Sequence, residues 1–182
     1  MKPQMIVTEK CPFMEELVKD SSRLSREDYR LMDWIDRAFY AKKPEILEKM
    51  LYRTLSSALK IRAVCVLCEI GTANSVYILS RVLLEDKDPL VRHEAAFALG
   101  QMGYRNAVPS LIKAMLTDSN ILVRHEAAGA LGSIGDISAM NALLKAEMDG
   151  SPEVRESASL AIMNLEYLGR KNFFQQRTLI EE

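Results

Sequence analysis

The chain has 182 residues, and its 48% hydrophobic and 27% charged side chains are the balance of a folded globular protein rather than a disordered one. Its 24 basic and 25 acidic side chains give a formal net charge of −1, which argues against a nucleic-acid-binding surface because such a surface needs a basic excess. The longest purely apolar run, residues 63–68, is too short to span a bilayer, and the first residues lack the apolar stretch of a signal peptide. We therefore expect a cytoplasmic protein without a membrane partner.

Residues 1–43 lie outside the repeating part of the chain and are predicted to form an N-terminal helical extension. Ser25 is a suitable N-cap for a helix in this extension. Five apolar side chains recur on it at helical spacing: Tyr29, Met32, Trp34, Ile35 and Phe39. We expect this helix, with Trp34, to cover the apolar face of the first repeat, because the terminal repeat of an array otherwise exposes its core to water. The alternative for Trp34 and Phe39 is an aromatic pocket for a partner.

From Pro44 onward, a pair of helices is predicted to recur four times. A basic residue stands near the start of each second helix: Lys60, Arg92, Arg124 and Arg155. Their numbers differ by 32, 32 and 31, a period that is typical of solenoids built from paired helices. The repeat domain is predicted to span residues 44–168, with the last helix at about 153–168. Residues 169–182 are predicted to form a polar C-terminal tail.

The turns between paired helices carry aspartates: Asp88, Asp118 and Asp149. We expect them to form a structural ladder with the arginines of the second helices, and the alternative for these arginines is an anion-binding site. Asp88 also suits the N-cap position of a helix, with Pro89 as its first residue. Gly71 follows the second helix of the first repeat, where glycine readily adopts a left-handed conformation.

One stretch occurs twice, as VRHEAAFALGQMG at residues 91–103 and VRHEAAGALGSIG at residues 123–135. It contains the only two histidines of the chain, His93 and His125, each followed by a glutamate, Glu94 or Glu126. In the fourth repeat, Glu156 and Ser157 take the place of the His-Glu pair.

Neighbouring second helices would pack about 9–10 Å apart, so an imidazole and a carboxylate reaching from both sides can meet on one ion. Two histidines and one carboxylate suit iron, manganese or zinc. The alternative is that these residues are ordinary polar side chains on the rim of the concave face. Small residues surround the motif and would let the helices approach closely and leave room for a ligand: Ala95, Ala96, Ala98, Gly100, Ala127, Ala128, Gly129 and Gly132.

The three cysteines are an odd number without the spacing of a disulfide framework, which fits a reducing compartment. Cys65 and Cys68 form a CxxC motif inside an apolar helical run. We interpret them as core residues, and the alternative is a redox or zinc site.

The signature VRxEAAxALGxIG resembles HEAT-like repeats of the phycobilisome-lyase type. This resemblance implies an all-α, right-handed α-solenoid of about four helix pairs, here with an N-terminal helical cap. From residue 47 to 168, the order of the motifs is similar to one half of deoxyhypusine hydroxylase. That resemblance implies that His93, His125 and Glu126 ligate one iron and that Glu94 lies near the substrate amine or behind the ligands. Because only one half is present, a homodimer would be needed to supply four His-Glu pairs.

Two functions are therefore predicted. The first is a protein-binding module whose concave face carries an acidic rim of Glu94, Glu126 and Glu156 and grips a protein segment, which could be basic. The alternative is a deoxyhypusine hydroxylase-like, non-haem di-iron oxygenase assembled as a homodimer, in which a modified lysine would be the substrate. Whether the chain is an enzyme is left open, and so is the identity of any metal.

Overall fold

The computed structural model describes the backbone of residues 25–52 and 56–181 and the side chains as far as residue 169. Cys11 and most of the predicted N-terminal extension lie outside these residues. Within the described ranges there are nine α-helices and no strand. The elements in chain order are α2 (Arg26–Ala41), α3 (Pro44–Leu51), α4 (Ser57–Ile70), α5 (Ala73–Glu85), α6 (Pro89–Met102), η2 (Arg105–Ala107), α7 (Val108–Thr117), α8 (Ile121–Ile134), η3 (Ile137–Ala139), α9 (Met140–Ala146) and α10 (Pro152–Glu181).

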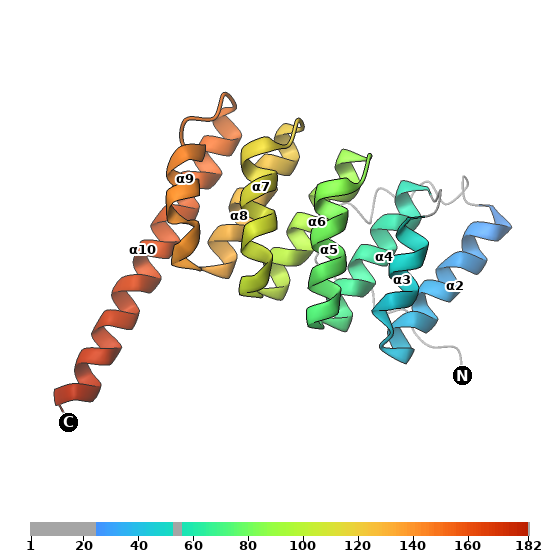
Figure 1. The fold of residues 1–182 in the computed structure, drawn as a ribbon, viewed down its shortest axis with the longest axis horizontal. Helices are drawn as coiled ribbons and strands as arrows, with labels where there is room; N and C mark the ends of the chain where they lie inside the picture. Colours follow the sequence, from blue (N-terminus) through green and yellow to red (C-terminus); the bar gives the residue numbers. More distant parts are fainter. Residues whose placement is uncertain (1–24, 53–55, 182) are drawn as a thin grey trace.

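The helices form four consecutive pairs, α3 with α4, α5 with α6, α7 with α8 and α9 with α10. The pairs stack side by side, so that the first helices make one layer and the second helices make the other (Figure 1). Each second helix packs against the second helices of the neighbouring pairs. The predicted all-α fold with four helix pairs is confirmed.

The ends of the helices follow from local chemistry that recurs from repeat to repeat. Asp88 caps α6, since its side chain accepts a hydrogen bond from the backbone N–H of Leu90 at 2.9 Å, and Pro89 is the first helical residue. The second helices α4, α6 and α8 end at glycines with φ of +66°, +70° and +69°. These positive values are in the left-handed region, where glycine carries no steric cost. The sequence therefore places helix ends at equivalent points of each repeat.

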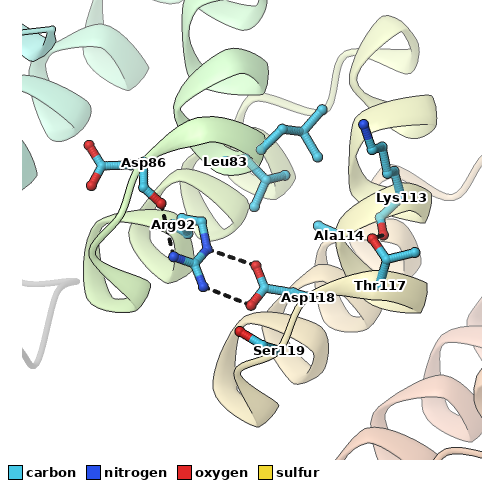
Figure 2. Close-up of a pocket in the computed structure, with 9 residues that line it drawn as sticks. Leu83, Asp86, Arg92, Lys113, Ala114, Thr117, Asp118 and Ser119 are labelled. Carbon is cyan, nitrogen blue, oxygen red and sulfur yellow. Dashed lines mark hydrogen bonds and ion pairs between the residues drawn. The ribbon is translucent and has the colours of Figure 1, made fainter.

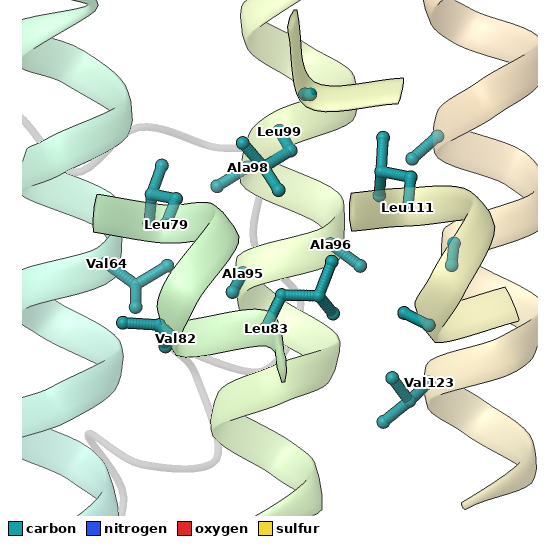
Figure 3. Close-up of a cluster of buried hydrophobic side chains, with 14 of the residues drawn as sticks. Val64, Leu79, Val82, Leu83, Ala95, Ala96, Ala98, Leu99, Leu111 and Val123 are labelled. Atoms are coloured by element: carbon teal, nitrogen blue, oxygen red, sulfur yellow. The ribbon is translucent and has the colours of Figure 1, made fainter. Parts of the chain in front are cut away.

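The core lies between the two layers and runs along the array. Figure 3 shows Leu79 and Leu83 of α5 among side chains of the second helices, including Val64 of α4 and Ala95 and Leu99 of α6. All five of these side chains are fully buried. Because every repeat adds leucines and alanines to the same layer, burial of apolar surface at about 25 cal/mol per Å² stabilises each repeat through its neighbours.

Helix α2 packs against α4 and α3 at the N-terminal end of the array. Ser25 caps it as predicted, with its hydroxyl accepting from the backbone N–H of Asp28 at 3.2 Å. Ile35 and Ala38 are the buried residues of α2, whereas Trp34 is 56% exposed. The prediction that Trp34 covers the first repeat was wrong. It lies one residue before Ile35, about 100° around the helix, and therefore points away from the array.

Helix α10 is longer than predicted and continues from Pro152 through Glu181, so the predicted boundary at residue 168 falls inside it. Its C-terminal half extends away from the other helices (Figure 1). Even with α10 included, none of the described helices combines the length and the apolar character that crossing a membrane requires.

Candidate functional site

Ion pairs join the turn of each repeat to the next. Arg92 donates two hydrogen bonds to Asp118, at 2.7 and 2.8 Å, and Arg124 donates two to Asp149, at 2.9 and 3.0 Å. The third nitrogen of Arg92, Nη1, donates to the backbone carbonyl of Asp86 at 2.9 Å (Figure 2). The predicted ladder is confirmed for Asp118 and Asp149. Because these guanidinium groups already hold a carboxylate on their paired donors, they have little capacity left to bind an anion.

The prediction that Asp88 belongs to this ladder was wrong. Its carboxylate accepts hydrogen bonds from the backbone of Leu90 and from the hydroxyl of Ser57. The ladder position is taken by Asp86, whose Oδ2 lies 2.7 Å from Nζ of Lys60. The reason is local, since Asp88 stands directly before Pro89 and its side chain serves as the N-cap of α6.

An open depression of ≈ 350 Å³ lies beside the ladder (Figure 2). Arg92, Lys113 and Asp118 supply charged side chains to its wall. Two of the three are already bonded to each other, so the depression is explained by the geometry of the ladder. It does not bring together a set of groups that points to a ligand.

The ladder also sets the ionisation of its aspartates. The hydrogen bond from Arg124 lowers the pKa of Asp149 below its ordinary value, against an opposing effect of burial. Nearby, a hydrogen bond from the Ser151 hydroxyl is the main reason why the pKa of Glu153 is lowered. Both groups are therefore carboxylates throughout the neutral pH range.

The histidines reach from one second helix to the next. Nε2 of His93 on α6 lies 3.4 Å from Oε2 of Glu126 on α8, and both side chains are 21% exposed. Nδ1 of His125 on α8 lies 2.6 Å from the Ser157 hydroxyl on α10 and 3.3 Å from the backbone carbonyl of Glu153. Each histidine therefore meets the residue that holds the glutamate position of the following repeat.

Ser157 was not predicted to take part in this arrangement. The signal was present in the sequence, because Ser157 occupies the glutamate position of the His-Glu motif in the fourth repeat. Its side chain is only 8% exposed, so the hydrogen bond to His125 also satisfies a buried hydroxyl.

Glu94 lies in a different environment from Glu126 and Glu156. It is 4% exposed, and its Oε1 is 3.8 Å from Sγ of Cys65 on α4. In contrast, Glu156 is exposed on α10. The predicted acidic rim therefore consists, at the surface, of Glu126 and Glu156, and the binding role predicted for Glu94 and Glu156 stays a prediction.

The predicted metal ligands are only partly brought together. His93 and Glu126 are adjacent, while His125 directs Nδ1 toward Ser157. In the part of the chain that the structure describes, no group of three or more histidine, cysteine, aspartate or glutamate side chains is arranged to share an ion. The described side chains therefore do not fit a metal without rearrangement, and the ligand roles of His93, His125 and Glu126 stay predictions.

Small residues set the spacing of the second helices. A Cβ added to Gly100 of α6 would lie 2.9 Å from Cα of Ala130 on α8, and one added to Gly132 of α8 would lie 2.9 Å from Cα of Ala161 on α10. The predicted close approach is confirmed at these two junctions. Gly100 corresponds to Gly132, 32 residues later, and Ala130 corresponds to Ala161, 31 residues later, which relates positions on α6, α8 and α10.

The exposed face of α8 combines an apolar, an open and an acidic position. Leu122 is 57% exposed, and a Cβ added to Gly129 would meet no atom within 4 Å. Glu126 lies between them in sequence and presents a partly exposed carboxylate. These positions belong to one helix face, because residues three, four and seven apart lie on the same side. The sequence reading of Gly129 as room for a ligand agrees with the open space above it.

The CxxC cysteines are partly buried against the core. Burial is the main reason why the pKa of the Cys68 thiol is raised to about 11, and its Sγ lies 3.6 Å from the backbone carbonyl of Ala98. A redox-active or zinc-binding cysteine needs a lowered pKa, so the geometry favours the interpretation of Cys68 as a core residue.

Comparison with known proteins identifies the repeat. A family model described as HEAT repeats matches residues 44–125 and 78–163. A search of curated proteins finds no match.

Three solved structures resemble the chain. Human deoxyhypusine hydroxylase in complex with glycerol matches with a TM-score of 0.61 and 28% identity, over 80% of this chain and 48% of that protein. A structure of the complex of CpcE and CpcF of phycocyanin lyase from Nostoc matches with a TM-score of 0.57 and 26% identity, over 68% of this chain and 53% of that chain. An engineered protein matches with a TM-score of 0.50 and 25% identity, over 72% of this chain and 39% of that protein. The chain thus spans about half the length of the first two.

Proposed function

Because the chain belongs to the HEAT-repeat family, we propose that it is a protein-binding module that uses the exposed face of its second helices. The exposed face of α8 carries this proposal. Leu122 offers an apolar contact, Gly129 leaves the surface above it open, and Glu126 offers a carboxylate. An apolar side chain of a partner can lie over Gly129 without displacing any atom of this chain.

The neighbouring helices extend this face. Phe97 of α6 and Leu160 of α10 hold the positions that correspond to Gly129, and Phe97 is partly exposed while Leu160 is 61% exposed. Larger apolar residues therefore flank the open position on both sides. This pattern of anchors around an open position is typical of surfaces that bind an extended or helical protein segment.

The charges favour a basic segment. Arg92 and Arg124 are bonded to Asp118 and Asp149, so the ladder is close to neutral, whereas Glu126 presents a carboxylate at the same layer. Complementary charge contributes mainly to the specificity and rate of association.

The experiment compares two substitutions of the same glycine. Peptides selected from a random displayed library on the native protein should combine an apolar residue with lysine or arginine. Gly129→Trp should abolish their binding, since the indole fills the open space, while Gly129→Ala should change affinity by less than about threefold. Glu126→Gln should weaken binding and reduce its salt dependence. Tyr77→Trp, on the first-helix layer at a site that is 58% exposed, is the matched control. Selected peptides that bind Gly129→Trp as tightly as the native protein would place the binding surface elsewhere.

A second candidate function rests on the similarity to human deoxyhypusine hydroxylase, 28% identical over 80% of this chain, and on the 3.4 Å approach of His93 and Glu126. In this candidate, His93, His125 and Glu126 bind iron, and a homodimer forms a di-iron oxygenase. About one iron per chain in a dimer, lost in Glu126→Ala and in His125→Ala, would support it. Protein that takes up no Fe(II), measured by elemental analysis, would exclude it and leave the binding module.

A further inference from the structure

The outward side of α10 carries large side chains where the interior helices carry small ones. Gly132 of α8 contacts Ala161 of α10 so closely that a Cβ would lie 2.9 Å from its Cα. The residue of α10 that corresponds to Gly132, 31 positions later, is Met163. Since Gly132 faces the next repeat, Met163 faces the side of α10 on which a fifth repeat would stand.

Two more apolar residues share this side. Leu160 and Tyr167 are three residues before Met163 and four residues after it, on the same helix face. The exposed fractions of Leu160, Met163 and Tyr167 are 61%, 65% and 63%, and we call these three residues the α10 edge patch. Met148, at the end of α9, is 85% exposed, and Ser159 of α10 donates a hydrogen bond to Glu147 at 2.7 Å, which holds this end of α9 against α10.

The α10 edge patch is not built to continue the array. At the interior junctions a glycine allows backbone-to-backbone contact, whereas Met163 would hold a neighbouring helix farther away. In the described part of the chain, no other helix lies on the outward side of α10 (Figure 1). The patch therefore fits a partner helix at the wider spacing at which long side chains interdigitate.

The charges along α10 show which partner fits. Glu156 stands seven residues before Met163, and Arg170 stands seven residues after it, with Lys171 next to it. In an antiparallel pair of α10 helices centred on Met163, Glu156 of each copy lies opposite Arg170 of the other. A surface that is complementary to itself in this way is the mark of a two-fold symmetric interface.

We infer that the partner is a second copy of this chain, docked through the α10 edge patch in an antiparallel α10 pair about Met163. The two arrays are then joined at their C-terminal edges, and Glu156, predicted from the sequence to bind a partner, contacts the second copy. This inference does not depend on the proposed peptide-binding face of α8, because Leu122, Glu126 and Gly129 remain outside the patch.

The first experiment measures the mass of the full chain in solution by sedimentation. The native chain should show twice the 20.5 kDa of one protomer at micromolar concentration. Met163→Glu should raise the dissociation constant by about thirtyfold or more, as expected for a central interface residue, with unchanged helical content. Tyr77→Glu, at a similarly exposed site on α5, should leave the dimer intact. A native chain that is monomeric, or a dimer that survives Met163→Glu, would overturn the inference, and so would equal loss of the dimer in Tyr77→Glu.

The second experiment tests the antiparallel arrangement. Glu156→Arg and Arg170→Glu should each weaken the dimer, and the two changes combined should restore it, because the pair is then reversed. A short bis-maleimide should link Met163→Cys chains into covalent dimers and should not link Tyr77→Cys chains. A combined variant that is no tighter than either single variant, or equal linking of both cysteine variants, would refute this geometry.

Discussion

Gly132→Ala should destabilise the array, although alanine favours helices over glycine by about 1 kcal/mol. The new Cβ would lie 2.9 Å from both Cα and Cβ of Ala161. Inserting a carbon into a packed contact costs about 1–3 kcal/mol, and the upper end applies because Cα belongs to the backbone and cannot rotate away. The free energy of unfolding should therefore fall by about 1–2 kcal/mol after the gain in helix propensity is subtracted.

The same helix supplies the control. Gly129→Ala, less than one turn earlier, adds a Cβ that meets no atom within 4 Å, so it should raise the free energy of unfolding by about 0.5–1 kcal/mol. Ala161→Gly in the Gly132→Ala background removes one of the two contacted carbons. It should recover only part of the loss, since Cα of residue 161 remains in place.

Urea unfolding followed by circular dichroism measures all three variants. In a chain of this size, 1 kcal/mol corresponds to a shift in Tm of about 2–4 °C, so opposite shifts of the two glycine variants are resolvable by thermal unfolding as well. Equal stabilisation by Gly132→Ala and Gly129→Ala would show that α8 and α10 pack less closely in solution, and it would remove the argument that glycine sets their spacing.

Three more predictions concern the polar contacts between repeats. Arg124→Met should lower the free energy of unfolding by about 2–3 kcal/mol, because it leaves the partly buried carboxylate of Asp149 without its partner, whereas Arg37→Met, which breaks an exposed pair, should cost less than about 1 kcal/mol by urea unfolding. Since the folded-state pKa of Asp149 is lowered, the stability from this group is complete above about pH 5 and is lost as the pH falls through the unfolded and then the folded pKa; Asp149→Asn should make unfolding curves less dependent on pH in that range. Ser157→Ala should cost about 1 kcal/mol by removing the hydrogen bond to His125, and an unchanged midpoint would show that this bond contributes nothing.

The features that could be predicted from the sequence are those that depend on neighbouring residues. The basic residues at a period of 32, 32 and 31 fix the number of helix pairs, because each pair must present the same face to the core. Pro89 after Asp88 fixes the start of α6, and Gly71 fixes the end of α4. These signals act within one turn of helix, so they do not depend on how helices are oriented relative to each other.

The features that could not be predicted depend on the rotation of a helix about its axis and on its register with the next helix. Trp34 and Ile35 are adjacent in sequence, but one faces solvent and the other faces the core. Glu94 and Glu126 occupy equivalent positions in nearly identical stretches, yet only Glu126 has a histidine on the preceding helix. At the place that corresponds to His93, the first repeat has Ile61, and Glu94 is buried near Cys65 instead. The environment of a repeated residue is therefore set by the preceding repeat as much as by its own.

The same argument accounts for the departures in the fourth repeat. Where α8 carries Glu126 and Gly132, α10 carries Ser157 and Met163, and these two changes lie on opposite sides of the helix. Ser157 faces α8 and retains a hydrogen bond to His125, so the inward side of α10 still meets the demands of a repeat junction. Met163 faces outward, where no further repeat of this chain restricts its size. A terminal repeat that keeps its inward contacts and replaces a glycine by a large apolar residue on its outward side has the structure expected of an end that binds another surface, which is why the mass of the native chain in solution is the measurement that bears most directly on how this protein works.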